Sequence, residues 1–321
     1  MLLSPPPDAA RPTVLTLSNG IEVRTFAPPP DFDPLTADND TLLRNGFPAR
    51  PPEGPHLDRF TQVLTQLKGR LNYIQPTLRV NADRFHGPLR RAAQTQEGTE
   101  TTHNWSGGVV YAPGGQSFSW VQADWIIPSV SAPTVGQTYY CSSWIGMDGD
   151  GSKDVCQAGV ECDVSRTSTT ADAATYPWFE WFPDPEVAIT NFPVNYGDSI
   201  TALVCAGPGA GANKAAVYFT NLTTGAYTSV VFTAPAPTTL VGNAAEWIVE
   251  APELDGVQTE MADYDTVTFS TCQAYLGNNG PTVNAGTGNN INMIDANNQP
   301  VSNGSLIGPT GVQCQYVGPV P

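Results

Sequence analysis

The sequence predicts an all-β protein, an antiparallel sandwich of two sheets, preceded by an N-terminal segment of a different kind. Three observations support this prediction: 30 Pro and 30 Gly among 321 residues indicate many turns, only 14% of residues are charged, and all seven Trp follow residue 104. From residue 104 onward, short segments that alternate apolar and polar residues are separated by turn signals such as PGG, DGDG and TTG. This pattern is typical of strands with one buried face. We therefore divide the chain into residues 1–103 and a β-sandwich domain over 104–321.

The N-terminal segment combines an extended region, a helix and a linker. Residues 1–55 are rich in proline with little periodicity, so we expect them to be extended and loosely packed. In residues 56–74 apolar side chains recur every three or four positions, which predicts one amphipathic helix. Arg90 and Arg91 precede a polar stretch, and we expect residues 90–103 to form a flexible, cleavable linker.

Charge separates the two parts of the chain. The whole sequence has 14 Lys+Arg and 30 Asp+Glu; residues 1–100 hold 11 of each, which leaves 3 basic and 19 acidic residues in 101–321, a net charge of −16. A domain this acidic repels phosphates, so nucleic-acid binding is not expected. Protonation near about pH 3–4 would relieve its self-repulsion, which fits work in acid; surface acidity that only aids solubility fits almost as well.

Cysteine usage and hydropathy bear on the compartment. All six cysteines follow residue 140, and an even number in a turn-rich chain predicts disulfides and an oxidising compartment, although buried free thiols remain an alternative. No apolar run reaches the roughly 18 residues that cross a membrane, and the first ten residues do not read as an intact signal peptide. We expect no membrane association.

The positions of the histidines exclude several catalytic mechanisms for the β domain. The only histidines, His56, His86 and His103, all precede the β domain, so we expect neither a histidine-dependent nucleophile nor a histidine-ligated zinc inside the sandwich. Oxygen-bearing residues alternate from Asp148 to Asp154 as in calcium loops, but Lys153 stands where such a loop needs glycine. We favour a tight hairpin turn there, and we expect no metal and no cofactor.

Carboxylate and amide side chains are therefore the remaining candidates for catalytic groups in the β domain. The stretch from residue 140 to residue 180 carries Trp144, Gln157, Trp178 and Glu180 on strand-like segments, where one sheet face could gather them. Strand alternation places Trp178 and Trp181 on opposite faces. A second stretch, AAEWIVE over residues 244–250, places two glutamates on one face. From the residues alone, either glutamate could act with the amide.

Several motifs occur in the order in which the glutamic peptidases (eqolisins, peptidase family G1) carry them. The matching segments are NWSG at 104–107, Trp144 with Gly146, Asp148 and Gly149, Gln157 with Gly159, WFEWFP at 178–183, GDSI at 197–200, NLTTG at 221–225, and the glutamate motif at 245–250. They span nearly all of residues 104–317. Each motif is weak alone, but together they are specific, and the chain resembles this family.

The resemblance implies a concanavalin-like (lectin-like) sandwich with one concave, substrate-holding sheet. It implies an acid-acting endopeptidase in which Glu250, rather than Glu246, is the catalytic general base and acid and Gln157 stabilises the oxyanion. Four further residues would line the substrate cleft: Trp144, Asp148, Trp178 and Glu180.

The resemblance also implies a secreted, monomeric proenzyme that acts on polypeptides. The near-neutral, arginine-bearing segment 1–103 would be a prosegment that inhibits its own domain by pairing with cleft carboxylates and is released in acid. Two alternatives stay open: a lectin-like domain that binds or hydrolyses glycans with Glu180 and Glu250, and an inactive binding module.

Overall fold

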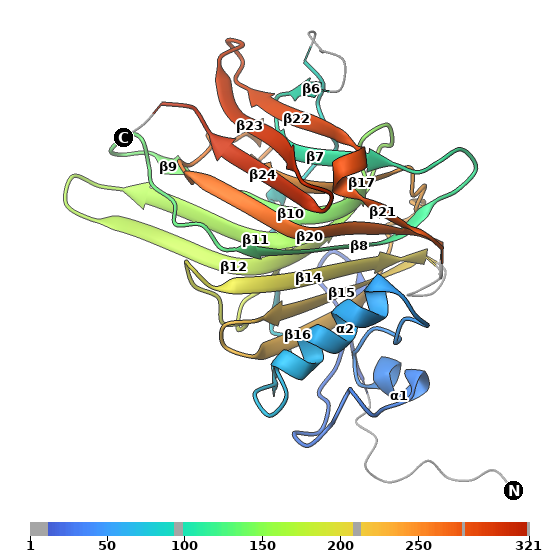
Figure 1. Ribbon diagram of the computed structural model, residues 1–321. Coiled ribbons are helices and arrows are strands. Elements are labelled where there is room, and N and C mark those ends of the chain that lie inside the picture. The colour runs from blue at the N-terminus through green and yellow to red at the C-terminus, as the bar shows by residue number, and fades with distance from the viewer. Residues whose placement is uncertain (1–11, 93–98, 208–212, 278–279, 320–321) are drawn as a thin grey trace, which may run out of the picture.

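A computed structural model describes residues 12–92, 99–207, 213–277 and 280–319. β-Strands are the main regular structure of these residues, and nearly all strand pairs are antiparallel. The ladder of paired strands folds into two packed layers (Figure 1). The predicted two-sheet β-sandwich is therefore confirmed. No helix within the described part of the chain is long and apolar enough to cross a membrane.

The first sheet carries the motifs singled out in the sequence. Its strands, in spatial order, are β4 (Leu78–Val80), β13 (Val187–Ile189), β12 (Ala171–Trp181), β11 (Val155–Arg166), β10 (Ser142–Asp148), β17 (Ala244–Glu250), β7 (Trp105–Tyr111), β22 (Asn289–Ile294) and β6 (Thr99–Thr102), with the short β9 (Thr138–Tyr139) against β11.

The second sheet continues from β22 and packs behind the first. Its order is β23 (Pro300–Ile307), β24 (Gly311–Tyr316), β20 (Thr266–Leu276), β8 (Phe118–Ile126), β14 (Ser199–Ala206), β15 (Lys214–Asn221), β16 (Ala226–Thr233), β2 (Glu22–Thr25) and β1 (Thr13–Thr16), with β21 (Thr282–Asn284) beside β20 and β3 (Asn72–Tyr73) beside β16. A 3-10 turn, η2 (Ala285–Thr287), and a small sheet of β19 (Val257–Gln258), β18 (Glu253–Leu254) and β5 (Arg84–Phe85) complete the described elements.

The core lies between the two sheets. Alternation turns Phe179 and Trp181 of β12, and Trp247 of β17, toward the second sheet, where they are buried with side chains of β8, β14 and β20. Indole N–H groups also join the layers, because Trp247 donates to the Gln122 carbonyl at 2.9 Å and Trp125 to the Ser143 hydroxyl at 3.0 Å. The opposite face of the first sheet carries the side chains of the candidate active site.

The N-terminal part is more ordered than expected. Two helices, α1 (Asn39–Arg44) and α2 (Pro55–Gln66), and the hairpin β1–β2 lie in it. The helix expected over 56–74 ends at Gln66, because Gly69 adopts a left-handed φ of 75° and the chain turns into β3. Residues 1–55 were expected to be loosely packed, which is wrong for their described portion: Leu42 and Phe47 are fully buried against the second sheet.

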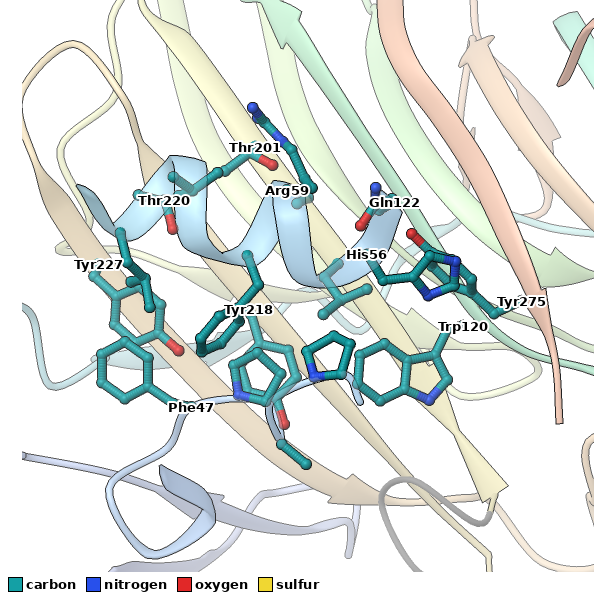
Figure 2. A pocket seen from close by; sticks show the side chains of 18 residues that line it. Phe47, His56, Arg59, Trp120, Gln122, Thr201, Tyr218, Thr220, Tyr227 and Tyr275 are labelled. Carbon is teal, nitrogen blue, oxygen red and sulfur yellow. The ribbon is translucent and has the colours of Figure 1, made fainter. Parts of the chain in front are cut away.

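Helix α2 lies across the outer face of the second sheet, over β14–β16 (Figure 1). A cavity of about 100 Å³ remains beneath it, lined by helix residues such as His56 and Arg59 and by sheet residues such as Trp120 and Tyr275 (Figure 2). This cavity lies on the far side of the second sheet from the motif-bearing strands. It reflects incomplete packing of the N-terminal part on the sandwich.

The cysteine prediction is corrected. All six cysteines, Cys141, Cys156, Cys162, Cys205, Cys272 and Cys314, are free and buried. Burial raises the pKa of each thiol, so all six are protonated. They pack as small apolar side chains between strands, which an even cysteine count cannot distinguish from disulfides.

Candidate active site

The site is built on the face of the first sheet that points away from the core. The strand register places Gly159 of β11 between Trp144 of β10 and Trp178 of β12, and pairs Gln157 with Glu180. Ser142 of β10 lies opposite Glu250 of β17. The side chains expected to converge are therefore on one face, and Trp181 faces the core as predicted.

Gly159 makes room for the two indoles. A Cβ atom at this position would lie 2.4 Å from the Cβ of Trp144 and 2.5 Å from the carbonyl oxygen of Ser143. Trp144 and Trp178 are fully buried on either side of it, and the Trp178 indole donates to the Ser142 hydroxyl at 3.0 Å. The glycine of the Gln157 motif thus has a packing role.

At the centre of this face lies a histidine from the N-terminal part. His86, which follows β5, is fully buried, and its ring stacks on Trp178 with centroids 3.8 Å apart and an interplanar angle of 8°. The sequence analysis set all three histidines apart from the β domain because they precede it in the chain. In the folded protein, the N-terminal part brings His86 onto this face of the sheet.

Carboxylates surround the His86 imidazole. Its Nε2 lies 3.1 Å from Glu186 and 3.2 Å from Glu161, and its Nδ1 lies 3.3 Å from Oε2 of Glu250. All three carboxylates are buried. Burial would lower the pKa of His86, but its hydrogen bonds to Glu161, Glu186 and Glu250 outweigh burial and raise that pKa well above its usual value. The ring is therefore an imidazolium at neutral pH.

The backbone of His86 is also hydrogen-bonded to residues of the site. Its N–H donates to both carboxylate oxygens of Glu180, at 3.1 and 3.2 Å, and its carbonyl oxygen accepts from Nε2 of Gln157 at 2.5 Å. Gln157, Glu180 and Glu250 thus all contact one residue. Glu180 binds its backbone N–H and Gln157 binds its backbone C=O, as the groups of a peptide-binding site would.

Glu250 and Glu246 share a strand face but differ in their surroundings. Glu250 accepts from the Trp144 indole at 2.9 Å and from the Asn104 amide at 3.4 Å. The Glu246 carboxyl is buried without a hydrogen-bond partner among the described residues. Burial raises the pKa of both carboxyls, but hydrogen bonds from His86 and Trp144 oppose the shift at Glu250. Of the two glutamates, Glu250 is therefore the one whose surroundings stabilise the ionised carboxylate.

Asp148 lies at the far end of β10 and makes no hydrogen bond to His86. Its carboxylate accepts from the backbone N–H groups of Val241 and Asn243, at 2.7 and 3.0 Å, and so fixes the loop that leads into β17. Burial raises its pKa to about 6. The oxygens of Asp150 and Asp154 likewise accept from protein donors, in the turn between β10 and β11.

Besides His86, sequence reasoning missed three residues of the site. Glu161 lies two positions beyond Gly159 on the same face, so alternation could have identified it. Asn104 was noted only as part of a motif, yet its amide donates to the Pro88 carbonyl at 3.1 Å and to Glu250. Glu186 precedes β13 outside any regular pattern, and no sequence signal points to it.

One group of side chains at the site has the composition of a metal site. The ligand atoms of His86, Glu161 and Glu186 all lie within 4.8 Å of one another, so the group could hold a divalent cation. The positive charge there is already supplied by protein groups, because Arg84 also pairs with Glu161 at 2.9 Å. Burial opposes ionisation of Glu161, but the charges of Arg84 and His86 prevail and lower its pKa to about 2.

The close approach at Gly159 predicts a clear cost for a methyl group. Gly159→Ala should displace Trp144 and lower the free energy of unfolding by roughly 1–3 kcal/mol, measured by urea denaturation at neutral pH. The matched control is Gly114→Ala in an open turn, where nothing lies within 4 Å of the added Cβ, and it should change stability by less than about 0.5 kcal/mol. Equal stabilities of the two variants would contradict this role.

Comparison with known proteins places the site in context. The profile of the Peptidase A4 family matches residues 103–316. Aspergillopepsin-2 of Aspergillus niger is 30% identical over 196 residues, 56% of this chain and 66% of that protein, so the chain spans just under two thirds of this relative.

Two solved structures are similar to the described fold. Scytalido-glutamic peptidase with a transition-state analogue inhibitor is 27% identical with a TM-score of 0.55, over 67% of this chain and 98% of that one. SCP-B, an eqolisin in complex with the tripeptide Ala-Ile-His, is 26% identical with a TM-score of 0.50, also over 67% and 98%. The suspected resemblance is confirmed, and the chain belongs to the Peptidase A4 family of peptide-bond hydrolases, the glutamic peptidases.

Proposed function

We propose that the protein is a secreted, monomeric endopeptidase that works in acid on polypeptide substrates and is made as a zymogen. Membership of a peptidase family and the similarity to an eqolisin that holds a peptide support this proposal. The observation that carries it is the convergence of Gln157 and Glu250 on His86, where the amide contacts a peptide carbonyl oxygen at 2.5 Å and the carboxylate lies 3.3 Å from the same residue.

The reaction follows from these contacts. In the active enzyme a substrate carbonyl would replace that of His86, and the Gln157 amide would stabilise the negative charge that develops on its oxygen. Glu250, held by Trp144 and Asn104, would take a proton from water as the water oxygen attacks the carbonyl carbon. The same proton would then pass to the departing amine nitrogen as the C–N bond breaks. Glu250 ends each cycle ionised.

The N-terminal part would act as the prosegment, with residues 84–91 seated as a substrate would be. They are not hydrolysed, because Nδ1 of His86 lies 3.3 Å from Oε2 of Glu250 and occupies the carboxylate that would otherwise activate water. Arg84 adds ion pairs to Glu161 at 2.9 Å and Asp163 at 2.7 Å. The predicted processing site within 90–103 stays a prediction, since residues 93–98 lie outside the described part.

Acid would release this segment. Burial leaves the pKa of Glu180 and Glu250 raised, but at Glu161 the charges of Arg84 and His86 outweigh burial and lower the pKa. A group whose pKa is lower in the closed state stabilises that state at higher pH and loses the contribution as the pH falls. For Glu161 the loss runs from the ordinary value of 4.5 to about 2. The raised pKa of His86 keeps the ring charged throughout this range.

The proposed dyad predicts a specific pattern of lost activity. Glu250→Gln and Gln157→Ala should each reduce hydrolysis of a denatured protein at about pH 3–4 by at least roughly a hundredfold, because one removes the base and the other the oxyanion donor. Pepstatin should leave the parent active. Glu246→Gln is the matched control on the same strand face and should keep most of the activity. Equal activity of all variants would place the site elsewhere.

The proposed inhibition predicts a shifted activation pH. His86→Gln has no charge to pair with the carboxylates, so the full-length chain should process itself and become active about one pH unit or more above the wild type. Processing is followed by gel electrophoresis and activity between about pH 7 and pH 3. Lys68→Gln, which removes an exposed positive charge of the N-terminal part far from the site, should behave as wild type. Unchanged activation in His86→Gln would refute the inhibitory role.

A further inference from the structure

We propose that protonation of His56 in acid helps to release the N-terminal part from the sandwich, through a contact separate from the active site. The inference rests on the proposed zymogen activation and adds a second pH-sensitive contact to it. His56 lies in helix α2, on the outer face of the second sheet, whereas the active site lies on the outer face of the first. The two contacts therefore belong to opposite sides of the molecule.

The ring of His56 joins helix α2 to the second sheet. It packs against the ring of Tyr275 in β20, and together with Tyr275 and Trp120 of β8 it lines the cavity beneath the helix (Figure 2). Its Nε2 is hydrogen-bonded to the hydroxyl of Thr282 in β21. The ring thus contacts two neighbouring strands of the sandwich domain, and its partners there are aromatic rings and a hydroxyl, which suit a neutral imidazole.

The helix itself opposes a positive charge on this ring. His56 is the second residue of α2, and a helix N-terminus carries a partial positive charge. Arg59 lies one turn further along the same side of the helix and adds a full positive charge. The carboxylate of Asp124 on β8 is already paired with Arg59, at 2.5 Å. A protonated His56 would therefore be a second cation beside a pair that is already neutral.

The other ionisable groups around the ring do not supply a buried counter-charge. Arg50 lines the adjoining pocket, and its guanidinium donates to three backbone carbonyls of the N-terminal part. Glu53 lines the same pocket but is exposed to solvent, where screening weakens its attraction. Burial raises the pKa of the Tyr275 hydroxyl, so it stays neutral. Protonation of His56 is therefore opposed as long as α2 stays docked.

The pH range of this effect follows from the lowered basicity of the ring. Burial lowers the pKa of His56 from 6.5 to about 4. A base whose pKa is lower in the docked state stabilises that state at high pH, and the contribution is lost as the pH falls from the ordinary value through the lowered one. For His56 this loss runs from 6.5 to about 4, above the range of 4.5 to about 2 for Glu161. Helix α2 would therefore loosen first on acidification.

Replacing His56 with glutamine tests the inference. Glutamine cannot take up the proton but still offers a donor to the hydroxyl of Thr282. In His56→Gln the pH at which the full-length chain processes itself should fall by about half a pH unit or more, the opposite direction to His86→Gln. Processing is followed by gel electrophoresis, and activity after complete processing should equal that of the wild type. An unchanged or higher processing pH would overturn the inference.

The matched control moves the histidine to the exposed side of the same helix. The double variant His56→Gln/Gln66→His contains as many histidines as the wild type, but position 66 is exposed, so the new ring is protonated equally well whether or not α2 is docked. This variant should process at the pH of His56→Gln. A return to the wild-type pH would show that the buried position of His56 has no special role.

Hydrogen–deuterium exchange of α2 tests the release without peptidase activity. In a Glu250→Gln background, exchange of the amides of residues 57–66, corrected for its intrinsic pH dependence, should rise as the pH falls from 6.5 to about 4, and His56→Gln should delay this rise. A rise confined to lower pH, or identical profiles with and without His56, would overturn the inference. A His56-dependent rise combined with no digestion of protein by the wild type would instead overturn only the peptidase proposal.

Discussion

The structure depends on a ring of buried carboxylates that must be paired with positive charge. Glu161, Glu186 and Glu250 surround one point on the first sheet, and each is almost completely removed from solvent. Burying one unpaired carboxylate costs several kcal/mol, so three together require a cation. His86 supplies it from a segment far away in the sequence. The site and the position of the N-terminal part are consequences of this one requirement.

Opposite charges also pair the N-terminal part with the sandwich at other positions. The N-terminal part carries 11 of the 14 basic residues and the sandwich 19 of the 30 acidic ones, and they meet through pairs such as Arg84 with Asp163 and Arg59 with Asp124. The exposed pairs contribute little individually. Apolar contacts under α2 and the edge strands β1, β2 and β4 add area, but the cavity beneath α2 shows that this packing is incomplete. Incomplete packing of this kind is what the proposed release in acid requires.

Much of the scaffold could be predicted from the sequence, because strand alternation and turn residues are local signals. They separated Trp178 from Trp181 and allowed Gln157 and Glu180 to share a face, as observed, whereas the choice of Glu250 over Glu246 came from the order of the family motifs. The position of His86 could not be predicted, since it depends on long-range packing that no local pattern encodes. Disulfides were predicted from cysteine count alone, whereas buried thiols pack equally well in a sandwich core. Glu186, in an irregular segment, has no signal at all.

The protonation state of His86 in the full-length chain tests the central claim most directly. With only three histidines in the sequence, the ring nitrogens can be followed by ¹⁵N NMR from about pH 5 to 9, and a His86→Gln sample assigns the signal. The account predicts that His86 keeps both ring protons well above the pH at which an ordinary imidazole loses one, while His56, whose pKa burial lowers to about 4, is neutral throughout. A His86 that titrates near its ordinary value of 6.5 would contradict it.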